Sequence, residues 1–189
     1  MTPAVKDIYP LSPTQQGMLF HSLYGPDSGA YVVQVGFTVK GALDLEAFSQ
    51  AWRWLVQRHG VLRTAFVWDS LEAPLQVVGQ RAELHIALED WQTQPDPQQA
   101  LADWLAGDRR RGFDLSAAPL MRVTAFKLAT DTHRIIWTYH HLLLDGWSVP
   151  LLLRELLVAY QAFEQGRSPA LASPRPYRDY IAWLKQQDA

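Results

Sequence analysis

MRVTAFKLATDTHRIIWTYHHLLLDGWS, residues 121–148, is the stretch that most clearly predicts how this chain folds. Two runs rich in β-branched and aromatic residues, 121–128 and 133–139, lie on either side of the polar segment 129–132. Runs of this composition separated by a short polar segment are typical of two strands joined by a turn. The stretch therefore predicts a strand pair that ends just before or within two adjacent histidines.

Helices and further strands are predicted on both sides of this strand pair. A loop over 141–147 leads into a helix from about Ser148 to Gln165, which Gly166 ends. Other helices are predicted from the N-cap pattern Ser12, Pro13, Gln15 to Gly25, from Asp44 to Gly60, from Asp96 to Arg111 and around Tyr177 to Leu184. Other strands are predicted at 31–39, 62–68, 75–78 and 84–88. Because strands and helices mix without strict β–α–β alternation, the predicted fold class is α+β, a mixed or largely antiparallel sheet with helices packed on one face.

Composition narrows the class of protein. With 189 residues, 48% of them hydrophobic and 19% charged, the chain has the size and balance of one globular domain spanning 1–189. A net charge of −2 predicts neither nucleic acid nor a membrane surface as a partner. No apolar run approaches the roughly 20 residues of a membrane helix, and Met1 to Pro10 lacks a signal-peptide pattern. The absence of cysteine excludes thiol chemistry, and we expect a cytoplasmic protein.

The segment that follows the strand pair combines residue types that perform chemistry. Successive side chains of a strand point to opposite faces, so His140 and His141 are expected to diverge, one toward the structure and the other toward a cleft. Gly146 permits backbone shapes that other residues avoid and lets a ligand approach closely. Ser148 is placed to cap the next helix, whose N-terminal amides favour developing negative charge.

Other kinds of active site are excluded by their missing patterns. Two histidines and Asp145 superficially suggest zinc, but the usual ligand spacings are absent and the imidazoles should diverge, so no metal is predicted. Neither a Gly-rich phosphate loop nor a Gly-x-Ser-x-Gly nucleophile elbow occurs in the sequence. We therefore expect no cofactor of the chain's own.

The run His140 to Gly146 resembles the His-His-x-x-x-Asp-Gly signature of condensation domains of nonribosomal peptide synthetases and of their chloramphenicol-acetyltransferase-like relatives. Other segments resemble that family's motifs in the family's order, namely LSPTQQGMLF at 11–20, RHGVLRTAF at 58–66, FDLSAAPLMR at 113–122 and YRDYIAW at 177–183. Together they cover nearly the whole chain. The resemblance implies a chloramphenicol-acetyltransferase-like α+β sandwich.

The resemblance also implies that this chain contributes only part of an active site. Such domains consist of two lobes with the active site between them, and residues 1–189 correspond to the amino-terminal lobe. The expected function is peptide-bond formation between a donor acyl or peptidyl thioester and an acceptor aminoacyl thioester. Both are delivered on phosphopantetheine arms, so the expected partners are donor and acceptor peptidyl carrier proteins, the carboxy-terminal lobe and neighbouring synthetase domains. The lobe by itself is expected to be inactive.

Residue roles carry over from the family motif. His141 is implied to act on the attacking amine, either as a base or by positioning it, and His140 is expected to be structural. Asp145 is implied to form a buried ion pair with Arg63 that shapes the loop, and Gly146 to be required for backbone geometry. Trp147 is expected to belong to the core. Tyr9, Gln15 and Tyr180 are candidates to line a cleft, but packing is their expected role.

Two other interpretations stay open. One is a related activity on the same scaffold, such as epimerization, an ester-forming or cyclising variant, or a coenzyme A-dependent acyltransferase. The other is a non-catalytic module that only docks carrier proteins, although relatives of that kind tend to lose the histidine that matches His141. The Leu-Leu-Leu spacer and the Trp-Ser ending resemble condensation domains that accept a donor ending in a D-residue.

Overall fold

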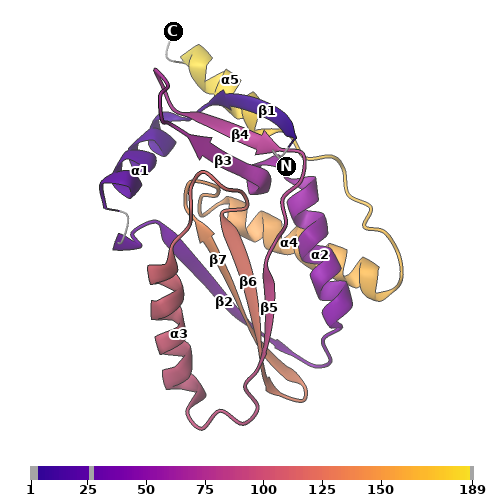
Figure 1. The fold of residues 1–189 in the computed structure, drawn as a ribbon. Helices are drawn as coiled ribbons and strands as arrows, with labels where there is room; N and C mark the ends of the chain where they lie inside the picture. The colour runs from indigo at the N-terminus through magenta and orange to yellow at the C-terminus, as the bar shows by residue number, and fades with distance from the viewer. Residues whose placement is uncertain (1–3, 26–27, 188–189) are drawn as a thin grey trace.

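The computed structural model describes residues 4–25 and 28–187 (Figure 1). The helices are α1 (Pro13–Tyr24), α2 (Leu45–Arg58), α3 (Pro97–Arg111), α4 (Ser148–Glu164) and α5 (Tyr177–Gln187), with a 3-10 helix at Gly60–Arg63. The strands are β1 (Val5–Pro10), β2 (Val32–Lys40), β3 (Thr64–Val67), β4 (Leu75–Gly79), β5 (Ile86–Asp90), β6 (Met121–Ala129) and β7 (Thr132–His140).

The strands form two sheets. The larger has the order β2-β7-β6-β5, and the smaller has the order β1-β4-β3. In the larger sheet β5 and β6 are parallel and the other neighbours are antiparallel. The register pairs Val32 with His140 and Met121 with Tyr139, so the end of β7 is held between two strands. The predicted α+β class with a mixed sheet is confirmed.

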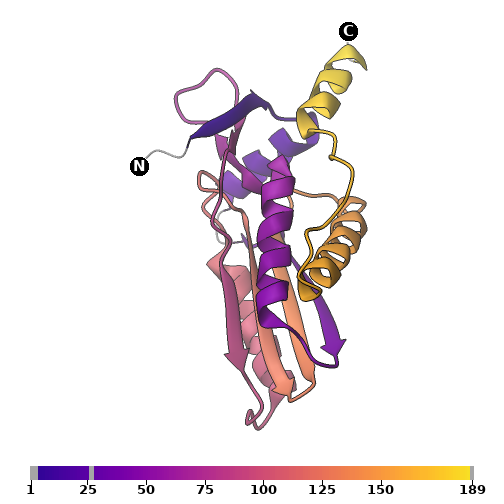
Figure 2. The same ribbon diagram turned by 90° about the vertical axis from the view of Figure 1, so that its right-hand side faces the viewer.

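Helices cover both faces of the larger sheet (Figures 1 and 2). Trp137 of β7 packs on Trp52 of α2, whereas the next residue, Thr138, bonds to Asp108 of α3. The expectation that all helices share one face therefore holds for α2 and α4 and is wrong for α3. The reason is that β6 and β7 are buried along almost their whole length, so side chains on both faces of the sheet need to be covered.

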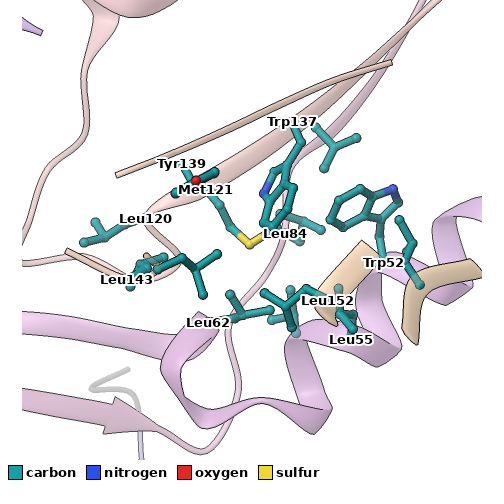
Figure 3. Close-up of a cluster of buried hydrophobic side chains, with 14 of the residues drawn as sticks. Trp52, Leu55, Leu62, Leu84, Leu120, Met121, Trp137, Tyr139, Leu143 and Leu152 are labelled. Carbon is teal, nitrogen blue, oxygen red and sulfur yellow. The ribbon is translucent and has the colours of Figure 1, made fainter. Parts of the chain in front are cut away.

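The main core lies between the sheet and the pair α2 and α4 (Figure 3). Trp52 and Trp137 are fully buried there, with ring centroids 5.3 Å apart in an edge-to-face arrangement. Aromatic pairs in this geometry contribute beyond their buried area. Leu143 extends into the same cluster from the loop after β7, so the loop is anchored by the core.

A buried polar cluster joins α3 to the opposite face of the sheet. The Asp108 carboxylate accepts hydrogen bonds from Arg122 Nε at 2.5 Å, Thr138 Oγ1 at 2.7 Å and Gln34 Nε2 at 2.8 Å. The Arg122 guanidinium also donates to the carbonyl oxygens of Gly112 and Asp108 and lies over the Phe113 ring. The buried ion pair of Asp108 and Arg122 thus attaches α3 to the sheet in addition to the aromatic contact between Trp104 of α3 and Phe126 of β6.

Local sequence signals explain where most elements begin. Ser12 and Gln15 form the predicted capping box, with Gln15 N donating to Ser12 Oγ at 3.2 Å and Ser12 N donating to Gln15 Oε1 at 3.0 Å. Asp44 and Asp96 cap α2 and α3 through their carboxylates. These helix starts, and the hairpin of β6 and β7, are confirmed.

Two features of the smaller sheet differ from expectation. β1 is absent from the predicted strands, because Val5 and Ile8 do not follow a two-residue period. It is a strand because it pairs with β4. The strand expected at 62–68 is shorter, because Gly60–Arg63 forms a 3-10 helix before β3. Across the described part of the chain, no helix has the length and apolar character needed to cross a membrane.

Candidate active site

The two histidines of the motif lie where β7 leaves the sheet. His140 is the last residue of β7 and pairs with Val32, and His141 N donates to the carbonyl oxygen of Tyr31 at 2.8 Å. Their side chains line different cavities, one on each side of the chain. The predicted divergence of the two rings is therefore confirmed.

His140 is built into the structure. It is 5% exposed, and its ring lies against those of Tyr31 and Phe113. Nδ1 accepts a hydrogen bond from Leu142 N at 3.2 Å, which places the proton of the neutral ring on Nε2, 3.4 Å from Ser22 Oγ. Burial, followed by the charge of neighbouring His141, lowers the pKa of His140 to about 4.

This low pKa predicts a loss of stability in acid. In the unfolded chain His140 titrates near its ordinary pKa of 6.5, so between pH 6.5 and about 4 the unfolded state binds more protons than the folded state. The free energy of unfolding is expected to fall as the pH drops through this window, by up to about 1.4 kcal/mol per pH unit.

Urea unfolding across this pH range measures the effect, and a His140→Asn variant is the matched control. Asparagine stays neutral and keeps an acceptor for Leu142 N, so its stability should lack this contribution to the slope. An NMR titration that placed the His140 pKa near 6.5 would contradict the prediction.

His141 lies against a cavity of about 430 Å³. The cavity is enclosed by the first turns of α1, the 3-10 helix, the loop 141–148 and the start of α5. Nδ1 of His141 is buried and has no hydrogen-bond partner among residues 4–25 and 28–187. Nε2 is therefore the ring nitrogen that a molecule in the cavity can reach.

The spacer between the histidines and the aspartate fixes the loop to the core. Leu142, Leu143 and Leu144 are all 5% exposed or less, although they belong to no helix or strand. Burying three leucine side chains stabilises the loop by several kcal/mol, at about 1.5–3 kcal/mol for each. The cavity wall next to His141 is thus rigid because its other side is hydrophobic core.

Asp145 stabilises the start of α4. Its Oδ1 accepts hydrogen bonds from Ser148 N at 2.8 Å and from Ser148 Oγ at 2.6 Å. The Ser148 hydroxyl bond is the main reason that the pKa of Asp145 lies below its ordinary value. A carboxylate at a helix N-terminus also interacts favourably with the helix dipole.

The expected ion pair between Asp145 and Arg63 is wrong. Arg63 is 1% exposed and donates instead to backbone carbonyl oxygens, from Nε to Gly79 at 3.0 Å and from Nη1 to Val56 at 2.6 Å, with Gln57 also bonded. The last carbonyls of a helix have no partner within it and bear partial negative charge. The 3-10 helix that contains Arg63 follows α2 closely, so the guanidinium reaches these carbonyls of α2 rather than a carboxylate across the loop.

Two further expectations for the motif are wrong. Gly146 does not adopt a positive φ, and a Cβ atom added there would meet no atom within 4 Å, so its backbone geometry does not require glycine. Trp147, which directly precedes α4, is 87% exposed rather than part of the core.

The cavity includes two of the residues for which packing was preferred over a place in a cleft. Gln15 and Tyr180 line it together with Tyr177. The capping box identifies Gln15 as part of a helix start but gives no sign that the same side chain faces the cavity of His141. Tyr9 lines a different cavity, on the other side of Tyr177. Among residues 4–25 and 28–187, no three acidic, histidine or cysteine side chains gather as metal ligands do.

The sequence matches a known family over nearly its whole length. The family model for the condensation domain matches residues 5–189. The chain belongs to the condensation-domain family. Over 96% of its residues this condensation-domain chain is 47% identical to one of the linear gramicidin synthase subunits of Brevibacillus parabrevis, and over 100% it is 39% identical to bacitracin synthase 3 of Bacillus licheniformis. The matches span only 2% and 3% of the lengths of those relatives.

Solved condensation domains share the fold of this chain. The first condensation domain of the CDA synthetase matches with a TM-score of 0.89 at 20% identity, over 98% of this chain and 46% of that one. A mutant starter condensation domain of rhizomide synthetase RzmA, in complex with C8-CoA and Leu-SNAC, matches with a TM-score of 0.87 at 24% identity, over 96% of this chain and 41% of that one. This condensation-domain chain therefore spans less than half of each solved chain.

Proposed function

We propose that this chain is the amino-terminal lobe of a two-lobed condensation domain that forms a peptide bond between two carrier-bound thioesters. A donor carrier presents an acyl or peptidyl group and an acceptor carrier presents an aminoacyl group, each on a phosphopantetheine arm. The observation that carries the proposal is the position of His141, which lines a 430 Å³ cavity at the end of β7 in a chain of this family. The C8-CoA bound by the RzmA domain is consistent with a substrate of the same pantetheine chemistry.

The reaction that fits this site transfers an acyl group from sulfur to nitrogen. The acceptor amine attacks the donor carbonyl carbon, a C–N bond forms, the C–S bond breaks and the donor arm leaves as a thiol. The amine gives up one proton, which ends on the departing sulfur. Nε2 of His141 is the accessible ring nitrogen, so it is the atom that hydrogen-bonds the amine or takes up this proton in passing.

The surroundings of His141 favour positioning over strong base catalysis. Asp145 is engaged by Ser148, and Nδ1 of His141 meets no carboxylate among residues 4–25 and 28–187. An orienting acid, as in a catalytic triad, is therefore not available from these residues. An α-amine with a pKa of about 8 is already partly neutral near pH 7, so it needs orientation more than deprotonation.

Exposed apolar side chains around the cavity support the existence of a covering second lobe. Trp147 and Leu151 are 87% and 56% exposed at the start of α4, and Tyr180 and Trp183 are 46% and 53% exposed on α5. Ser148 and Tyr180 line the same cavity, which places both groups near its edge. Large exposed apolar groups of this kind mark surfaces that bind another protein surface.

A carrier-to-carrier transfer assay tests the proposal. The complete two-lobed domain is mixed with donor and acceptor carriers loaded with a panel of amino acids, and the acceptor carrier is analysed by mass spectrometry. We expect dipeptidyl acceptor carrier with the complete domain and none with residues 1–189 alone. Turnover by residues 1–189 alone would overturn the assignment as half of an active site, and no product from any loaded pair would overturn the assignment of activity.

A further inference from the structure

Two glutamines buried behind the cavity form a closed pair. Gln15 of α1 is 4% exposed and Gln76 of β4 is 0% exposed. Gln76 Nε2 donates to Gln15 Oε1 at 2.9 Å, and Gln15 Nε2 lies 3.3 Å from Gln76 Oε1. Buried amides are costly unless they are bonded, so a pair in this position has a structural or functional reason.

Gln15 uses its remaining hydrogen-bonding capacity on the backbone. Its Oε1 accepts from Ser12 N at 3.0 Å, and its Nε2 donates to the carbonyl oxygen of Leu142 at 3.0 Å. An amide side chain offers two N–H donors and two acceptor lone pairs. All four are occupied, which fixes the orientation of the Gln15 amide.

The Leu142 carbonyl belongs to the residue directly after His141, in a segment that has left the sheet. Leu142 N is held by His140 Nδ1 at 3.2 Å, and His141 N is held by the Tyr31 carbonyl at 2.8 Å. The peptide groups on both sides of Leu142 are thus held by the side chains of His140 and Gln15 and by one backbone turn bond, from Leu143 N to the His140 carbonyl oxygen at 3.0 Å, instead of by a neighbouring strand. Backbone that no ladder holds depends on such bonds for its direction.

We propose that Gln15 is a positioning residue for His141, acting through its hydrogen bond to the Leu142 carbonyl. The inference rests on the proposed function, because it assigns Gln15 a part in the same amide-forming site. Gln15 lines the same cavity as His141. Its amide is therefore part of the cavity wall and also holds the backbone from which the imidazole projects. A shift of about 1 Å in a positioned group lowers a rate on the order of a hundredfold.

The test separates this role from simple stabilisation. Gln15→Met removes the bond to Leu142 but also leaves the Gln76 amide buried without its partner. The double variant Gln15→Met and Gln76→Met removes the amide pair, so neither amide is left buried without the other and part of the stability returns. Ser12 N and the carbonyl oxygens of Leu142 and Pro10 still lose a side-chain bond in this variant. Gln16→Met changes an exposed glutamine on the same turn and serves as the matched control.

Turnover and binding are measured separately in the complete domain with aminoacyl-loaded carriers. For the double variant we expect kcat to fall on the order of tenfold to a hundredfold, KM for the acceptor carrier to stay within about twofold, and Tm to recover part of what Gln15→Met loses. Recovery of kcat together with Tm would overturn the inference, as would a rise in KM at constant kcat or an equal effect of Gln16→Met.

A parallel His141→Ala variant distinguishes the two proposals. If His141→Ala abolishes turnover while the double variant keeps it, only the role of Gln15 is wrong. If His141→Ala keeps turnover, His141 has no part in the chemistry and the role of Gln15 is wrong with it. If the wild-type domain forms no product, the proposed function itself is wrong.

Discussion

Replacing His141 with alanine is expected to lower the transfer rate of the complete condensation domain on the order of 10²–10⁴-fold, the range that a positioned proton-transfer or hydrogen-bonding side chain contributes. His141 supplies the accessible ring nitrogen at the cavity. Asp145, an acidic residue that lines the same cavity, accepts a hydrogen bond from Ser148 instead. The alanine variant leaves the buried leucines of the loop untouched, so we expect it to fold and to bind loaded carriers like the wild type.

The matched control is His85→Ala, which removes an exposed histidine away from this cavity. Product is measured by mass spectrometry of the acceptor carrier, and carrier binding by titration. Equal rates for His141→Ala and the wild type would remove His141 from the chemistry. Loss of product together with loss of carrier binding would show that the variant disturbs docking rather than the reaction.

Replacing Asp108 with alanine is expected to lower the free energy of unfolding by about 3–5 kcal/mol, the cost of leaving one member of a buried ion pair without the other. Asp108 and Arg122 are 8% and 7% exposed, and Asp108 also accepts bonds from Thr138 and Gln34. Its removal leaves a guanidinium in the interior and two further donors without their acceptor.

Urea unfolding measures this loss, with Asp103→Ala as the control. Asp103 lies on the same helix but is exposed, so its replacement should change stability by no more than about 0.5 kcal/mol. The double variant Asp108→Leu and Arg122→Met should recover a large part of the loss, because apolar groups of similar volume often match a buried ion pair. A loss below about 1 kcal/mol for Asp108→Ala would contradict the account of this cluster.

Elements specified by local chemistry are predictable from the sequence. The capping box of Ser12 and Gln15 satisfies backbone groups within four residues, and the hairpin of β6 and β7 requires only two runs of strand-forming residues and a polar turn between them. β1 is not predictable in this way. It becomes a strand because β4, which is distant in the chain, offers it a partner.

The same distinction applies to the site. That His140 and His141 diverge follows from the alternation of side chains along a strand, which is local geometry. Arg63 donates hydrogen bonds to carbonyl oxygens at the end of α2, which have no partner within that helix. Asp145 accepts hydrogen bonds from Ser148 instead of pairing with Arg63. The family motif does not encode either choice of partner.

By itself the sequence determined the family, the helices α1 to α5, most of the strands and the strand end from which His141 projects, because each motif, cap and strand pattern is a run of residues close together in the chain. Only the tertiary structure decided that the first turns of α1, the 3-10 helix and α5 enclose the cavity with that histidine, and that Gln15 holds the backbone beside it. The bond from Gln15 to Leu142 alone joins residues 127 positions apart. Pairings of this kind are set by the packing of the whole core, and no local sequence pattern encodes them.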